Sequence, residues 1–142
     1  MGRIMAIDYG AKRTGLAVTD PERIIAGNLG TVETPRLMDY LASYFEREVV
    51  DVVVVGEAKH WDNTPSQSMA IIEPFVASLR AAYPDKEVAR IDERFTSKMA
   101  FQTMLDSGIG RKKRRDKALV DSISATLMLQ NYMQLLSNTL KQ

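Results

Sequence analysis

The fold of this chain is decided near its beginning, where residues 4–10 read IMAIDYG. Ile4 to Ile7 is a short continuous apolar run, which is typical of a strand that is buried on both faces. Asp8 ends the run, and the polar stretch from Tyr9 to Thr14 indicates a tight turn. The stretch therefore predicts a buried strand with a carboxylate at its carboxyl end.

Two more strands follow at short spacing. Leu16 to Val18 is apolar again, residues 20–23 (DPER) are a turn signal, and residues 24–32 indicate a third strand. Because both connections are too short to hold crossover helices, the three strands should form an antiparallel meander.

The periodicity of apolar residues changes after residue 32. Thr34 and Pro35 predict a helix start, with Thr34 as the capping residue, and apolar residues then recur at helical spacing. The rest of the chain predicts a strand over 49–55, a helix over about 66–83 with Pro74 inside it, a strand over 87–91, a helix from about 96 to 107, and a last helix from Asp116 to about Leu136. This order predicts an α/β fold with a five-stranded mixed sheet, three antiparallel strands followed by βαβα, and helices on both faces.

Length and composition limit the possible classes of protein. A chain of 142 residues is long enough for one domain with one core, so we expect a single domain over 1–142 with a polar tail at about 137–142. There is no cysteine, which fits a reducing compartment. No signal peptide or membrane span is evident, so we expect a cytoplasmic protein that does not bind a membrane.

Three acids fall where chemistry is expected. Asp8 ends the first strand, Glu93 follows the fifth, and Asp121 lies among apolar residues of the last helix. Each has an ordinary alternative, namely a turn-former for Asp8, an ion pair with Arg94 or Arg90 for Glu93, and a solvated position for Asp121. Carboxylates that converge at strand ends suit Mg²⁺ or Mn²⁺, and two such ions about 4 Å apart can promote phosphodiester hydrolysis.

Basic residues accompany these acids. The turn after Asp8 carries Lys12 and Arg13, and a second cluster comprises Arg111, Lys112, Lys113, Arg114, Arg115 and Lys117. Such runs are often solvated surfaces, but they also bind phosphate, which gives affinity for nucleic acid without reading its sequence. Small residues at Ala118, Ser122 and Ala125 should let the last helix pack close to the sheet and bring Asp121 toward Asp8.

Taken together, these motifs resemble the YqgF family, also called RuvX, whose members are described as Holliday junction resolvases and as pre-16S rRNA nucleases. The resemblance rests on residues 7–10 (IDYG) with Lys12 and Gly15, residues 54–56 (VVG), residues 92–97 (DERFTS), and Lys117 with residues 120–125 (VDSISA). It implies an RNase H-like fold of the RuvC type, with a metal-binding, catalytic role for the acids Asp8, Glu93 and Asp121.

One position departs from the family pattern. The family often has Gly-Leu-Pro after the fourth strand, whereas this chain has Gly56-Glu57-Ala58. Related resolvases place a catalytic acid on that strand, so Glu57 is an alternative to Glu93 as the second acid.

The resemblance implies a metal-dependent nuclease that matures the 5′ end of pre-16S rRNA, with structured RNA as its substrate. Two alternatives remain, a resolvase of branched DNA and a nucleic-acid-binding module without activity. A resolvase should be a symmetric homodimer, whereas an rRNA-trimming enzyme can be a monomer. An ATP-binding protein of the actin and sugar-kinase type also begins with Asp-x-Gly, but it needs two such domains.

Overall fold

The computed structural model describes residues 2–57, 69–92 and 117–140, and the side chains of residues 122–138 within the last range. The elements are β1 Arg3–Asp8, β2 Arg13–Thr19, β3 Ala26–Glu33, the 3₁₀ turn η1 Thr34–Arg36, α1 Leu37–Arg47, β4 Val50–Glu57, α2 Met69–Ala82, β5 Glu87–Asp92 and α5 Lys117–Leu140. The predicted helix over 96–107 and the predicted cap Asp116 lie outside the described residues.

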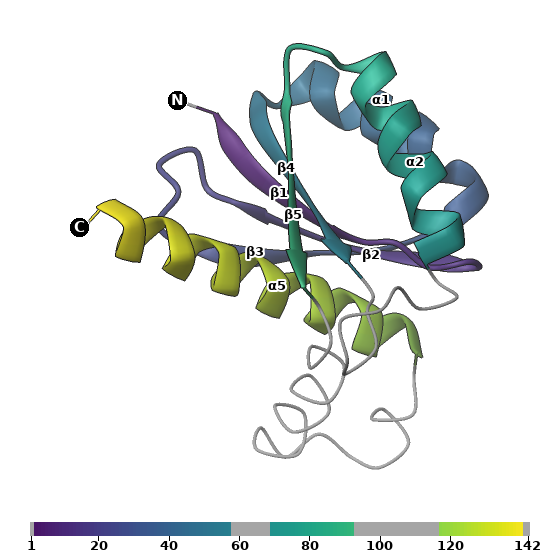
Figure 1. Ribbon diagram of the computed structural model, residues 1–142. Helices are drawn as coiled ribbons and strands as arrows, with labels where there is room; N and C mark the ends of the chain where they lie inside the picture. The colour runs from purple at the N-terminus through teal and green to yellow at the C-terminus, as the bar shows by residue number, and fades with distance from the viewer. Residues whose placement is uncertain (1, 58–68, 93–116, 141–142) are drawn as a thin grey trace.

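The described strands form one mixed sheet in the order β3-β2-β1-β4-β5 (Figure 1). β1 pairs antiparallel with β2, and β2 with β3, as the short connections predicted. β1 pairs parallel with β4, and β4 with β5. The predicted α/β architecture is therefore confirmed, and the carboxyl ends of β1, β4 and β5 meet at one edge of the sheet.

Helices cover both faces of the sheet, with α1 and α2 on one face and α5 on the other (Figure 1). Met5 and Ile7 of β1 belong to the core under α1 and α2, whereas Ile4 and Ala6 belong to the core under α5. Successive side chains of a strand point to opposite faces, so a strand buried on both faces needs an unbroken apolar run. Residues 4–7 supply that run, and all four are buried.

Small side chains let α5 lie close to the sheet. Ala6 of β1 and Ala17 of β2 are register partners on the α5 face, and both are fully buried. Ser122 and Ala125 of α5 are buried, as the predicted close packing of this helix requires, and Met128 and Leu129 complete this core.

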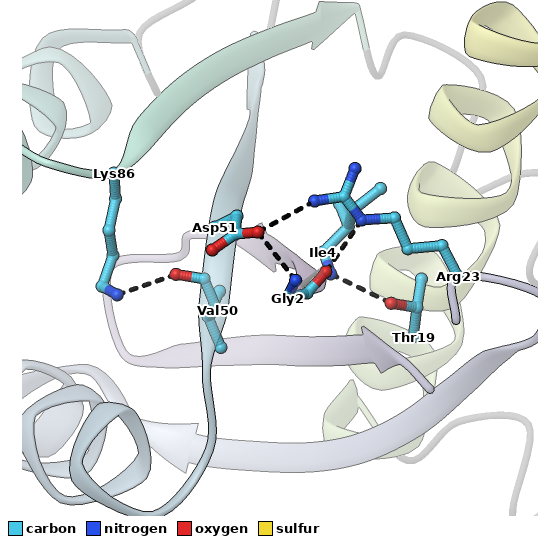
Figure 2. Close-up of polar contacts among 7 residues, drawn as sticks. All are labelled: Gly2, Ile4, Thr19, Arg23, Val50, Asp51 and Lys86. Carbon is cyan, nitrogen blue, oxygen red and sulfur yellow. Dashed lines mark hydrogen bonds and ion pairs between the residues drawn. The ribbon is translucent and has the colours of Figure 1, made fainter. Parts of the chain in front are cut away.

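Polar contacts join the start of β1 to the neighbouring strands β2 and β4 (Figure 2). The Thr19 hydroxyl accepts a hydrogen bond from the Ile4 amide at 2.9 Å. Asp51 accepts one from the Gly2 amide at 2.7 Å and forms an ion pair with Arg23 at 3.3 Å. These contacts fix the start of β1 against β2 and β4, at the end of the strand opposite Asp8.

Two local predictions were wrong. α5 continues to Leu140, beyond its predicted end at about Leu136, so residues 137–140 are helical. No glycine or proline interrupts this stretch, and the Gln134 side chain donates a hydrogen bond to Asn138 one turn later at 3.1 Å. Thr34 is not a capping residue, because it is the first residue of η1, and Glu33 precedes it without a side-chain cap.

None of the helices within residues 2–57, 69–92 and 117–140 is long and apolar enough to cross a membrane.

Ala17→Leu should lower the free energy of unfolding by about 1–3 kcal/mol, because a larger side chain cannot fit between β2 and the close-packed α5. Urea unfolding followed by circular dichroism measures this change. Ala42→Leu, on the exposed side of α1, is the matched control and should change stability by less than about 0.5 kcal/mol. Equal effects of the two variants would contradict the close packing.

Candidate active site

Asp8 lies at the carboxyl end of the central strand, on the face that α5 covers. It is the last residue of β1 and is half-buried, next to Gly15 of β2 in the sheet register. Ile4 and Ala6 face α5, and strand alternation gives Asp8 the same direction. The carboxylate therefore comes directly after a buried apolar run, where the strand leaves the core.

Helix α5 carries Asp121 along this same face. Asn28 of β3 donates a hydrogen bond to the buried Ser122 hydroxyl at 3.0 Å, which fixes the residue directly after Asp121. Further along α5, Met133 and Ser137 lie near residues 24–26. This segment is at the end of the sheet where β1 begins. The first turns of α5 are therefore directed toward the Asp8 end, although the Asp121 side chain lies outside the described residues.

Glu57 lies on the neighbouring strand but faces the other way. Val53 and Val55 of β4 belong to the core under α1 and α2, and alternation places Glu57 on their side of the sheet. Its register partner is Asp92, the last residue of β5. Glu57 also borders an open hollow at the sheet edge, lined further by Arg90, Ile91, Asp92, Asn131, Gln134 and Leu135.

Glu93 lies outside the described residues, directly after Asp92. Two residues before it, Ile91 packs in the core under α5. Alternate residues of β5, among them Ile91, therefore lie on the same face of the sheet as Asp8.

The turn after Asp8 is held by contacts on both sides. The Tyr9 ring stacks on Phe75 of α2, with ring centroids 4.5 Å apart. The Thr34 hydroxyl donates to the Gly10 carbonyl at 2.6 Å, and the Thr34 amide donates to the Lys12 carbonyl at 3.0 Å. A Cβ at Gly10 would overlap the carbonyl oxygen of Arg13, so only glycine fits there.

The predicted phosphate-binding residues are only partly described. Lys12 is exposed in this turn, and Arg13 is half-buried at the start of β2. Residues 111–115 lie outside the described residues, and Lys117 is described only as the first residue of α5.

The donor chemistry of the predicted site fits Mg²⁺ or Mn²⁺, since carboxylate oxygens are the preferred ligands of both ions. Within the described residues, however, no group of three or more histidine, aspartate or glutamate side chains could hold a metal ion. Of the predicted ligands Asp8, Glu93 and Asp121, only Asp8 has a described side chain. The metal site therefore stays a prediction.

Arg90 has a structural role at the carboxyl end of β4 that the sequence did not reveal, since the sequence suggested it only as a partner of Glu93. Its guanidinium donates to the Val55 and Gly56 carbonyls of β4 at 3.1 and 3.2 Å, and forms an ion pair with Glu73 of α2 at 2.8 Å. Because the arginine donates a hydrogen bond to Glu73, it lowers the pKa of that carboxyl below its ordinary value of 4.5. An arginine inside the otherwise apolar stretch 88–91 was the signal that could have found it.

The sheet order, with helices on both faces, defines the class of protein, an RNase H-like fold. RuvC from Thermus thermophilus, solved in complex with a Holliday junction substrate, superposes with a TM-score of 0.59 at 19% identity, covering 98% of each chain. A second Thermus thermophilus RuvC structure gives a TM-score of 0.55 at 15% identity, covering 96% of this chain and 97% of RuvC. These similarities establish the fold.

The sequence model described as "RuvX: Holliday junction resolvase" matches residues 2–135. A Flavobacterium johnsoniae relative named "Putative pre-16S rRNA nuclease" is 54% identical over 133 residues, 94% of this chain and 96% of its own length. A relative of the same name from Porphyromonas gingivalis is 53% identical over 133 residues, with the same coverage. The chain belongs to the RuvX family of nucleases, as the sequence motifs predicted.

Gly10→Ala should lower the free energy of unfolding by about 1–3 kcal/mol, because the added methyl group forces the turn after Asp8 to shift. Chemical unfolding in urea measures the loss. Gly27→Ala is the control, since a Cβ at Gly27 meets only the Val18 carbonyl oxygen, at 3.5 Å. If Gly27→Ala proves as destabilising as Gly10→Ala, the steric argument for Gly10 is wrong.

The ion pair of Glu73 and Arg90 should make stability depend on pH. The pKa of Glu73 is lowered in the folded chain, so its contribution is complete above about pH 4.5 and is lost as pH falls below that value. The stability difference between the wild type and Glu73→Gln should therefore shrink in urea titrations from about pH 6 to pH 3. In an Arg90→Met background this pH dependence should vanish, and its persistence there would assign it to another partner.

Proposed function

We propose that this chain is a metal-dependent nuclease that hydrolyses phosphodiester bonds in the maturation of the 5′ end of pre-16S rRNA. The observation that supports it most is the position of Asp8, a half-buried carboxylate at the end of the central strand under α5, the helix of Asp121. The relatives named for this activity are 54% identical over 94% of the chain, which supports structured RNA as the substrate. An enzyme that processes pre-rRNA would act in the cytoplasm.

Asp8, Glu93 and Asp121 would hold the metal. Mg²⁺ or Mn²⁺, when bound, supplies a Lewis acid for the phosphate and lowers the pKa of an attacking water. Asp8 contributes the carboxylate, and contacts of Tyr9 and Gly10 fix the turn that follows it. Lys12, Arg13, Arg111–Arg115 and Lys117 neutralise the phosphate backbone of the substrate, which gives affinity without base specificity.

Glu93 suits the role of second acid better than Glu57. Alternation along β4 directs Glu57 toward the α2 side, away from the face of Asp8. Ile91 of β5 packs under α5, two residues before Glu93. Glu57 remains the alternative, because it also borders the hollow beside Asn131, Gln134 and Leu135 of α5.

A Holliday junction is the second candidate substrate, because the family description that matches residues 2–135 names a junction resolvase. The same carboxylates could cut either nucleic acid, since the reaction at phosphorus is the same. A junction resolvase would act as a symmetric homodimer, whereas a monomer would suit rRNA trimming. The remaining alternative, a binding module without activity, predicts salt-sensitive RNA binding and no cleavage.

Asp8→Asn should reduce Mn²⁺-dependent cleavage of pre-16S RNA by at least about 100-fold, because it removes a charged ligand without changing the shape of the side chain. Asp39→Asn, an exposed aspartate in the first turn of α1, is the matched control and should cut like the wild type. A four-way DNA junction is assayed in parallel. Full activity of Asp8→Asn would refute the metal site, and cleavage of the junction alone would refute the RNA substrate.

The choice between the two glutamates is tested by a matched pair. Glu93→Gln should lose as much cleavage activity as Asp8→Asn, whereas Glu57→Gln should stay within about threefold of the wild type. The reverse result would make Glu57 the second acid.

A further inference from the structure

The turn that follows Asp8 is bound to the end of β3 by one threonine. The Thr34 hydroxyl lies 2.6 Å from the Gly10 carbonyl oxygen and 3.0 Å from the Thr14 hydroxyl. A carbonyl oxygen can only accept, so Thr34 donates its single hydroxyl proton to Gly10 and accepts from Thr14. Thr14 is fully buried, and the three residues form a short hydrogen-bond chain that ends two residues after Asp8.

This use of Thr34 is a tertiary contact and not a local one. A threonine before a proline at a helix start normally caps that helix, but here η1 begins without a side-chain cap. The hydroxyl instead reaches a carbonyl 24 residues earlier in the chain. The hydrogen bond thus contributes to the turn after Asp8 rather than to η1.

The contacts on either side leave Asp8 little freedom. Its predecessor Ile7 is fully buried, Tyr9 is stacked on Phe75, and Gly10 is held by Thr34. A Mg²⁺ or Mn²⁺ site tolerates only small errors in ligand position, so its ligands need supports that fix their backbone.

We propose that Thr34 is a positioning residue that holds Asp8 in the geometry required to bind the metal ion, a role that depends on the proposed nuclease function. Thr34 makes two separable contacts with the turn. Its hydroxyl holds Gly10, two residues after Asp8, whereas its amide holds the backbone of Lys12, the exposed residue proposed above to contact the substrate phosphate. Loss of the hydroxyl alone therefore weakens metal binding and kcat but leaves the KM for RNA unchanged.

Thr34→Val, which keeps the shape and removes the hydroxyl, tests this role. The Mn²⁺ dissociation constant, measured by electron paramagnetic resonance without RNA, should rise about tenfold, and kcat at subsaturating Mn²⁺ should fall in proportion. Thr34→Ser retains the hydroxyl and should restore the Mn²⁺ affinity to within about twofold. If Thr34→Val does not fold, Thr34→Ala removes the same hydroxyl without a branched methyl group and replaces it.

Thr19→Val is the matched control. Its buried hydroxyl accepts from the Ile4 amide at the opposite end of β1, so its loss costs stability without touching the turn after Asp8. The control should lower the unfolding midpoint yet bind Mn²⁺ like the wild type. Equal Mn²⁺ affinities of Thr34→Val and Thr19→Val, in a wild type that cleaves, would overturn the positioning role alone. A wild type without Mn²⁺-dependent cleavage would overturn the proposed function, and the positioning role with it.

Discussion

The parallel pairing of β1 with β4 is the constraint on which the rest of the structure depends. It places β1 in the middle of the sheet, with β2 on its other side, so that both edges of the strand are hydrogen-bonded. A strand in this position is covered on both faces, and only apolar residues can fill it without a large desolvation cost. Asp8 is the first residue after the buried run of β1, residues 4–7, at which a carboxylate can reach solvent or a metal ion.

Most of the fold could be predicted because it follows from periodicity and connection length. The apolar run at 4–7 and the short connections to β2 and β3 determine the meander, and the valines of β4 determine the second buried strand. The position of Asp8 at the end of the first strand could be predicted for the same reason, since it ends the buried run. The face of each strand residue followed only from the register together with strand alternation, which assigns Glu57 and Asp8 to opposite faces of the sheet, although Glu57 also borders the hollow beside α5.

The contacts that could not be predicted join residues far apart in sequence. Local propensity assigned Thr34 to the helix that follows it, but its hydroxyl bonds to Gly10, because the end of β3 lies beside the turn after β1. No local pattern distinguishes a capping threonine from one whose partner lies in another strand. The end of α5 was missed for a different reason, since polar composition alone does not stop a helix that lacks glycine and proline.

Two cations of the β5 region hold this edge strand in place. Lys86 donates to the Val50 carbonyl at 2.7 Å where β4 begins, and Arg90 donates to the Val55 and Gly56 carbonyls where it ends. An edge strand has neighbours on one side only, so such bonds limit its shift along β4. The register sets which face each residue of β5 presents, and a shift by one residue would exchange the faces. Arg90 thus helps to keep Ile91 under α5. It thereby also maintains the register of β5, the strand that Glu93 follows in the chain.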